Sequence, residues 1–355
     1  MTSHNYASHF LNGKRVWVAG HRGMVGSALV RRLASEPCEI LTAGRGELDL
    51  RRQIDVEAWM DHWRPHAVIV AAATVGGILA NDTLPAEFLY DNLMIEANII
   101  HGAKLFGVEK LLFLGSSCVY PRLAEQPIRE SALLTGPLEP TNQWYAVAKI
   151  AGIKMCQAYR RHYGCDFISA MPTNLYGPND TFDPVGSHVV PALLLKAHQA
   201  KVEHRTEIEL WGSGTPRREF MYVDDLADAL VHLLKVYSGE EHVNVGVGSD
   251  VTIRELAEIV MRVVGVEARI RFDQSKPDGT PRKLMDSGRL FGMGWRPKTS
   301  LEDGLQRAYA WYLESRCDLG TSARPIAGCA SRISENGLRP GAALGGAKDR
   351  SRSTV

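Results

Sequence analysis

The chain has 355 residues, of which 45% are apolar and 23% charged, and its formal net charge is +1. This balance gives no indication of a nucleic-acid or acidic-membrane partner, and no apolar run reaches the roughly 18–20 residues that a membrane helix needs. Six cysteines stand at scattered spacings without a CxxC pair, which argues against a metal site or a disulfide framework and for a reducing compartment. These features predict a cytoplasmic globular enzyme with one large domain or two smaller ones.

The first elements of the chain predict a dinucleotide-binding unit. After a polar leader over residues 1–13, which lacks the apolar core of a signal peptide, an apolar strand over residues 15–20 runs into a helical pattern. Glycines between a strand and a helix let a pyrophosphate approach the backbone, and the free N–H groups of the helix attract its charge. The glycines follow a GxxGxxG pattern, and we expect the whole loop to bind the cofactor: Gly20, His21, Arg22, Gly23, Met24, Val25 and Gly26.

Two arginines near the expected adenosine ribose favour NADP over NAD. A strand over residues 38–44 ends at Arg45, where proteins that bind NAD usually carry an Asp or Glu for the ribose 2′-hydroxyl. Arg22 lies in the glycine loop. Two guanidinium groups suit a 2′-phosphate. The alternative is that both arginines are solvated surface charges.

Further apolar strands over residues 67–73 and 110–117 alternate with helical stretches. This alternation predicts an α/β fold with a Rossmann-like, doubly wound parallel sheet. Ligands of such folds bind at the carboxyl ends of the strands. We therefore expect the residues at two strand ends to face the cofactor: Ala72, Ala73, Leu114, Gly115, Ser116 and Ser117.

A tyrosine and a lysine four residues apart, Tyr145 and Lys149, would lie on one face of a helix. The ammonium group would stabilise the phenolate and lower the tyrosine pKa from about 10. Such a tyrosine can protonate a carbonyl oxygen while hydride adds to the carbon, with Ser116 or Ser117 holding that oxygen. The same spacing is common by accident on amphipathic helices. The preceding glycine loop and the strand ending in GSS favour a functional pair.

The chain carries a glycine loop, then a strand that ends in GSS, and then a Tyr-x-x-x-Lys motif. In this order the three motifs resemble those of the extended short-chain dehydrogenase/reductases that act on nucleotide sugars. More narrowly, AGHRGMVGSA, VGGILAN, FLGSSCVYP, EPTNQWYAVAKIAG, MPTNLYGPND, WGSGTPRREF and SKPDGTPRK resemble the GDP-L-fucose synthase family over residues 14–315. The resemblance implies that GDP-4-keto-6-deoxy-D-mannose is epimerised at C3 and C5 and then reduced at C4 with NADPH. It also implies further cofactor contacts from Lys149, Pro172, Thr173, Asn174, Leu175 and His188.

The same resemblance implies a base and an acid for the epimerisation. Inverting a carbon next to a ketone requires proton removal on one face and donation on the other. Cys118 matches the base of the family, and a nearby cation could lower its thiol pKa from about 8.5; His188 matches the acid. A free cysteine is otherwise more often a small buried hydrophobe, and a histidine opening a helix more often a cap. No Asp or Glu adjoins Ser117 and Cys118, which tells against a dehydratase of this superfamily.

After residue 175 strands and helices no longer alternate strictly along the sequence. This change predicts an NADP-binding domain over residues 14–175, followed by a smaller α/β substrate domain over residues 176–315. Some later segments should return to the first domain. The family match assigns Trp211 to the guanine or sugar, Arg218 and Lys196 to the diphosphate, and Asp278 to a ribose or guanine edge. The alternatives are a core tryptophan, two surface charges and a turn residue.

Local signals predict two helix starts and a tail. Asp224 or Asp225 should cap one helix, and Thr252 with Glu255 should form a capping box on another. Residues 316–355 are rich in Gly, Ala, Ser and Arg and predict a disordered tail. The resemblance further implies a homodimer built from helices near residues 85–107 and 143–163.

Two alternatives to this function stay open. One is another nucleotide-sugar epimerase or reductase of the same fold. The other is a non-catalytic dinucleotide-binding scaffold, against which the joint presence of Tyr145, Lys149, Cys118 and His188 speaks.

Overall fold

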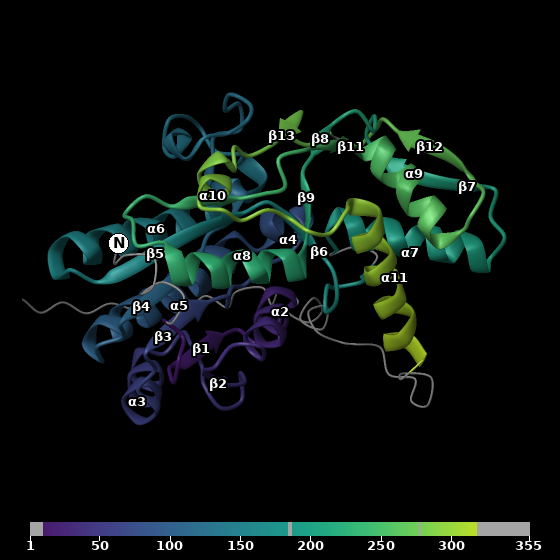
Figure 1. Ribbon diagram of the computed structural model, residues 1–355. Coiled ribbons are helices and arrows are strands. Elements are labelled where there is room, and N and C mark those ends of the chain that lie inside the picture. Colours follow the sequence, from purple (N-terminus) through teal and green to yellow (C-terminus); the bar gives the residue numbers. More distant parts are fainter. Residues whose placement is uncertain (1–9, 184–186, 277, 318–355) are drawn as a thin grey trace, which may run out of the picture. The chain divides into compact units, whose positions relative to one another are not determined.

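A computed structural model describes residues 10–183, 187–276 and 278–317 (Figure 1). Its central sheet has six strands in the order β10-β5-β4-β3-β1-β2, and every pairing is parallel. The expected doubly wound α/β fold is confirmed. The strands are β1 (Arg15–Ala19), β2 (Glu39–Leu41), β3 (Ala67–Val70), β4 (Lys110–Leu114), β5 (Asp166–Pro172) and β10 (Val243–Val245).

The order of the strands reverses between β1 and β3. From β1 the chain passes to the edge strand β2 and then returns to the other side of β1 as β3. β3 and β4 are buried along their whole length, which explains why they read as continuous apolar runs. The loops after β1 and β3 therefore leave the sheet next to each other, at the position where doubly wound folds bind their ligands.

Helices cover both faces of this sheet. On one face α2 (Met24–Leu33) packs against α8 (Val223–Val236), and on the other α5 (Pro85–Leu105) packs against α3 (Gln53–Trp63) and α6 (Gln143–Tyr163). Each face buries its own apolar core. The first core contains Leu29, Leu33, Leu226 and Leu230, and the second contains Val56, Ile99, Ile100 and Ile153.

The strands end earlier than the apolar runs predict. β2, β3 and β4 stop at Leu41, Val70 and Leu114, three residues short of the expected ends. The end of β3 coincides with that of its neighbour β1, whose last residue, Ala19, pairs with Val70. The residues that we expected to face the cofactor therefore lie in loops just past the carboxyl ends of β3 and β4.

Elements from the second half of the chain build a third apolar core, which includes Leu194, Leu210, Leu256, Val260 and Leu305. They lie together at the right of Figure 1. β10, α8 and α10 (Gly288–Gly292) pack against elements of the first half of the chain, while the two predicted domains and their boundary at residue 175 stay predictions. The remaining elements are α4 (Ile78–Thr83), β6 (Asn174–Tyr176), α7 (Val189–Val202), β7 (Glu207–Trp211), β8 (Arg217–Arg218), β9 (Phe220–Tyr222), β11 (Val251–Thr252), α9 (Ile253–Val264), β12 (Arg269–Asp273), β13 (Arg282–Lys283) and α11 (Leu301–Cys317), with short 3₁₀ turns η1 (Ser117–Val119), η2 (Glu130–Ala132) and η3 (Pro140–Asn142).

One of the two predicted helix caps is confirmed. The Thr252 hydroxyl accepts from the Glu255 N–H at 3.0 Å, and the Glu255 carboxylate accepts from the Thr252 N–H at 2.7 Å. The predicted aspartate cap of α8 is wrong. Asp224 instead pairs with Arg31 of α2 at 2.6 Å, and Asp225 accepts N–H groups of the loop that precedes α11.

The ends of the chain are described in part. Leu11 is buried and the Gly13 N–H donates to the Pro37 carbonyl at 2.8 Å, so the expected leader is ordered over residues 10–13. Residues 1–9 of the leader and residues 318–355 of the expected tail lie outside the described residues. Within the described part of the chain, no helix combines the length and apolar character needed to cross a bilayer.

A buried polar network joins the loop after β4 to β10. The Tyr120 hydroxyl lies 2.9 Å from Nε2 of His242 and donates to the Asn244 side chain. The amide of Asn244 donates in turn to the Ile128 carbonyl at 2.9 Å. Because His242 is only 4% exposed, burial lowers its pKa from 6.5 to about 4. The folded protein therefore holds this imidazole in its neutral form.

We expect His242 to make the protein less stable in mild acid. The unfolded chain takes up a proton near pH 6.5 and the folded one only near pH 4, so stability is complete above pH 6.5 and is lost as the pH falls towards 4. Between pH 7 and 5 the loss should be about 2 kcal/mol of the free energy of unfolding. Other buried groups also titrate in this range, Glu96 among them, so the test is the difference between variants. From pH 7 to 5, the free energy of urea unfolding should fall by about 2 kcal/mol more in the wild type, and in a His62→Gln control where the imidazole is exposed, than in His242→Gln. An equal loss in all three would contradict the assignment.

Candidate functional site

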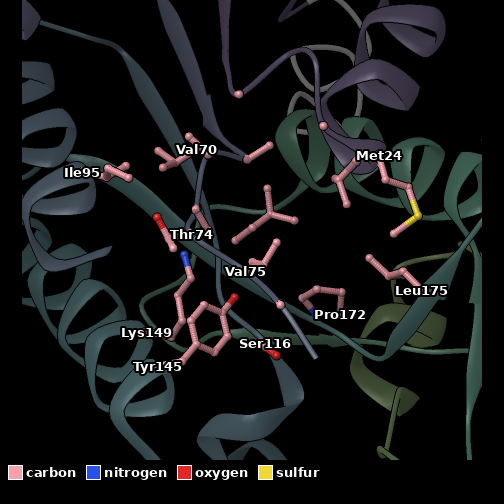
Figure 2. A pocket seen from close by; sticks show the side chains of 18 of the residues that line it. Met24, Val70, Thr74, Val75, Ile95, Ser116, Tyr145, Lys149, Pro172 and Leu175 are labelled. Atoms are coloured by element: carbon pink, nitrogen blue, oxygen red, sulfur yellow. The ribbon is translucent and has the colours of Figure 1, made fainter. Parts of the chain in front are cut away.

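A pocket of about 750 Å³ opens at the carboxyl ends of β1, β3 and β4 (Figure 2). The residues that we expected to contact the cofactor line it, with the exception of Gly26. Those lining residues are Gly20, His21, Arg22, Gly23, Met24, Val25, Arg45, Ala72, Ala73, Leu114, Gly115, Ser116, Ser117, Lys149, Pro172, Thr173, Asn174, Leu175 and His188.

The glycine loop is shaped by two close contacts. Gly20 has a φ of +88°, and a Cβ on it would lie 2.7 Å from Cα of Ala72. A Cβ on Gly26 would lie 2.1 Å from the Gly20 carbonyl, so Gly26 faces the loop backbone instead of the pocket. Gly23 precedes the ten-residue α2, and no side chain among the described residues caps this helix start. Exposed N–H groups at the start of a helix fit the pyrophosphate of a dinucleotide.

Basic groups gather beyond this loop. Arg22 and Arg45 both line the pocket, and a Cβ on Gly44 would lie 3.2 Å from the Arg22 guanidinium. Arg51 is a third lining arginine, which sequence reasoning missed, and Asp49 holds it in an ion pair at 3.0 Å. Arg22 and Arg45 are therefore the better placed pair for a phosphate.

The strand-end segment that follows β5 is tied to β9. The Thr173 hydroxyl and the Asn174 amide both donate to the Glu219 carbonyl, at 3.2 and 2.8 Å. The Glu219 carboxylate is itself buried and accepts from the N–H groups of Val247 and Gly248 at 2.7 and 2.8 Å. Hydrogen bonds between side chains and backbone groups therefore fix this wall of the pocket.

Tyr145 and Lys149 extend from α6 into the pocket (Figure 2). Nζ of Lys149 lies 5.8 Å from the Tyr145 ring centroid and 4.7 Å from the Phe113 ring centroid. Ser116 lies beside the tyrosine ring in the same view. The helix thus places the pair one turn apart on one face, as their spacing predicts.

The tyrosine pKa moves in the direction opposite to our expectation. Burial raises the pKa of Tyr145 well above 10, and Cys118 and Glu96 add to the rise. The cause is desolvation of the phenolate, and burial likewise lowers the pKa of Lys149. At neutral pH Tyr145 is therefore a neutral phenol, which is the form that donates a proton.

Cys118 lies in η1, directly after β4, and its thiol is buried next to the pocket without lining it. Its backbone N–H donates to the Ser116 hydroxyl at 3.4 Å. Burial raises the thiol pKa, while Lys283 and Lys149 act in the opposite direction. The expected lowering of the thiol pKa is therefore outweighed by burial in this structure.

His188 lines the pocket at the start of α7, with its side chain 51% exposed. Its Nδ1 lies 3.9 Å from the Asp180 carboxylate, whose side chain is 5% exposed. The second oxygen of Asp180 has no hydrogen-bond partner among the described residues. The imidazole thus faces the pocket with a buried carboxylate behind it, and sequence reasoning missed this carboxylate.

The four expected substrate-binding residues lie outside the pocket but near one another. Lys196 donates to the carbonyl of Glu209 on β7 at 3.0 Å, and the exposed Trp211 ends that strand. A Cβ on the next residue, Gly212, would lie 2.2 Å from the Asp278 carboxylate. Burial lowers the pKa of Arg218, and Asp278 opposes that shift. Their role in substrate binding stays a prediction.

Lys283 connects this group to the pocket. It lies on β13 beside β8, burial lowers its pKa, and it interacts with both Cys118 and Arg218. Sequence reasoning quoted its motif without giving it a role. A half-buried cation between two expected site residues is visible only in three dimensions.

Known proteins match this chain over most of its length. Residues 16–246 match the NAD dependent epimerase/dehydratase family. The GDP-L-fucose synthase of Sinorhizobium fredii (strain NGR234) is 64% identical over 310 residues, which cover 87% of this chain and 99% of that protein. The GDP-L-fucose synthase of Escherichia coli K12 is 52% identical, with coverages of 86% and 98%.

A solved structure also matches the fold of this chain. A crystal structure of a GDP-L-fucose synthetase from Naegleria fowleri bound to NADP has a TM-score of 0.79 to this chain and is 28% identical, covering 86% of this chain and 96% of that one. The chain therefore belongs to the NAD dependent epimerase/dehydratase family and, within it, to the group of the GDP-L-fucose synthases.

Proposed function

We propose that the protein converts GDP-4-keto-6-deoxy-D-mannose to GDP-L-fucose with NADPH, by epimerisation at C3 and C5 and then reduction at C4. The observation that carries the proposal is that Tyr145, Lys149, Ser116 and His188 line one pocket with the glycine loop. A binding-only protein has no use for this set. The substrate's 4-keto group makes both chemical stages possible at one site.

The epimerisation needs a base and an acid around an oxygen that can carry charge. C3 and C5 both adjoin the C4 ketone, so losing a proton from either carbon gives an enolate. Cys118, as thiolate, would remove that proton, and Lys283 and Lys149 favour the thiolate form. His188, exposed to the pocket, would donate a proton to the opposite face of the carbon. Tyr145 and Ser116 would hold the C4 oxygen meanwhile.

The reduction uses the same oxygen contacts. NADPH, when bound, supplies the hydride that adds to C4. Tyr145 would donate its phenolic proton to the C4 oxygen, and the Lys149 ammonium would stabilise the phenolate left behind. Arg22 and Arg45 would hold the 2′-phosphate that distinguishes this cofactor. Because Cys118 must remain a free thiol, we place the reaction in the cytoplasm.

We further propose a homodimer through α5 and α6. These helices pack on each other and carry exposed large apolar side chains. Trp144 and Val147, three residues apart on α6, share a face. Apolar groups exposed over two adjacent helices indicate a protein contact. The exposed side chains are Tyr90, Leu105, Trp144, Val147 and Tyr163.

Purified protein mixed with GDP-4-keto-6-deoxy-D-mannose should oxidise NADPH, followed by absorbance, and release GDP-L-fucose, identified by NMR. Tyr145→Phe should lower kcat by roughly 10²- to 10⁴-fold, because the proton donor is lost, and leave NADPH affinity nearly unchanged. Tyr163→Phe, at an exposed tyrosine on the same helix, is the control, because it removes a hydroxyl away from the pocket and keeps the apolar ring for the proposed dimer contact. No NADPH oxidation by the wild type would favour a scaffold. Oxidation without inversion at C3 and C5 would favour a plain reductase.

Cys118→Ser should suppress entry of solvent deuterium at C3 and C5 much more than it slows reduction of a ketone that is already epimerised. The reason is that a hydroxyl is a far weaker base than a thiolate, while the proton for reduction comes from Tyr145. Mass spectrometry of the product in D₂O measures the exchange. Cys165→Ser, at a half-buried cysteine, serves as control. Equal losses in both stages would place the base elsewhere.

Val147→Asp should convert the protein from a dimer to a monomer, since it puts a charge into an apolar contact. Sedimentation velocity gives the mass directly. Ile54→Asp on α3 changes an even more exposed apolar residue, 69% against 44%, and should leave the dimer intact. A monomeric wild type, or a Val147→Asp variant that still forms dimers, would refute this interface.

A further inference from the structure

A buried carboxylate lies beside the Tyr145 and Lys149 pair, and no step described above uses it. Glu96 is on α5, and one of its carboxylate oxygens lies 3.6 Å from Nζ of Lys149, with side-chain exposures of 1% and 3%. Neither carboxylate oxygen has a hydrogen-bond partner among the described residues. A carboxylate in an apolar interior is costly unless a charge compensates it. The Lys149 ammonium is that charge. Burial nevertheless raises the pKa of Glu96 from 4.5 to about 7, so the side chain is mostly a carboxylate only above that pH.

The helix opposite is shaped to admit this carboxylate. Gly152 follows Lys149 by three residues and lies on the same face of α6. A Cβ on Gly152 would lie 2.8 Å from the Glu96 carboxylate and 2.3 Å from the Phe113 ring. The Phe113 ring also contacts the ammonium of Lys149. The carboxylate therefore occupies a slot that only a glycine leaves open.

Other titratable groups around this pair do not replace the carboxylate. Tyr145 and Cys156 approach from α6, and Cys118 approaches from η1. Burial raises the pKa of all three, which keeps them neutral near pH 7. Burial also lowers the pKa of Lys149, and Glu96 is the largest influence opposing that shift.

We infer that Glu96 is a positioning residue for the proposed reduction: its carboxylate keeps the ammonium of Lys149 charged and directed towards the Tyr145 side of the pocket. The inference rests on the proposed function, because Lys149 supports the reaction only where Tyr145 donates a proton. It accounts for a carboxylate at the α5–α6 contact, where an apolar side chain would pack at lower cost.

The test compares Glu96→Gln, which keeps the shape and removes the charge, with Glu96→Asp, which keeps the charge. NADPH oxidation with the 4-keto sugar nucleotide is followed from about pH 5.5 to 10. The basic limb of the kcat profile should move down by about one pH unit or more in Glu96→Gln, because losing a negative charge eases proton loss from both Lys149 and Tyr145. Glu96→Asp should restore most of the profile. Glu87→Gln, an exposed acid in the first turn of α5, should match the wild type.

A double-mutant cycle separates this role from simple packing. In a Lys149→Met background, Glu96→Gln should change kcat by less than about twofold, since the group it acts through is gone. A loss as large as in the wild-type background, or an unshifted limb in Glu96→Gln, would overturn the inference and leave the proposed function standing. A wild type that oxidises no NADPH would defeat the proposed function itself. If Glu96→Gln does not fold, Glu96→Met, which also removes the charge and has a side chain of similar length, takes its place, and an unshifted limb in that variant overturns the inference.

Discussion

The pocket depends on a close backbone contact between the loop after β1 and the loop after β3. Gly20 has a positive φ and leaves room for Ala72, and Gly26 leaves room for the Gly20 carbonyl. A Cβ on Gly20 would push the two loops apart where the strand order reverses, and a Cβ on Gly26 would clash with the backbone of the loop after β1 itself. Because the contact is made by backbone, the start of α2 stays open to an anion, and the β3 loop forms the opposite wall.

Burial dominates the electrostatics of the site. It raises the pKa of Tyr145 and Cys118 and lowers that of Lys149 and Lys283, so each group is pushed towards its neutral form. Such a site keeps a phenol ready to donate its proton. A base is harder to provide, because a thiolate must form in the same apolar surroundings. Lys283 and Lys149 lie near Cys118 and favour its thiolate, which opposes the cost of burying that charge.

Local patterns predicted the sheet, the glycine loop and the Tyr145–Lys149 face, because each depends on residues close in sequence. The errors arise from contacts between distant segments. Asp224 is of a residue type that often caps helices, but its carboxylate pairs instead with Arg31, 193 positions earlier in the chain. The pKa directions were missed because spacing does not reveal how deeply a group is buried. Glu96 could have been noticed as an acid inside the mainly apolar run MIEANII, but nothing in the sequence shows that it pairs with Lys149.

Helix α6 carries Lys149 on its buried side and Val147, two residues before it, on its exposed side. A helix moves as a stiff rod, because each turn is hydrogen-bonded to the next. A tilt that adapted the outer surface to a new neighbour would also displace the ammonium inside. A substitution on the exposed face that changes the proposed dimer contact is therefore expected to alter turnover as well.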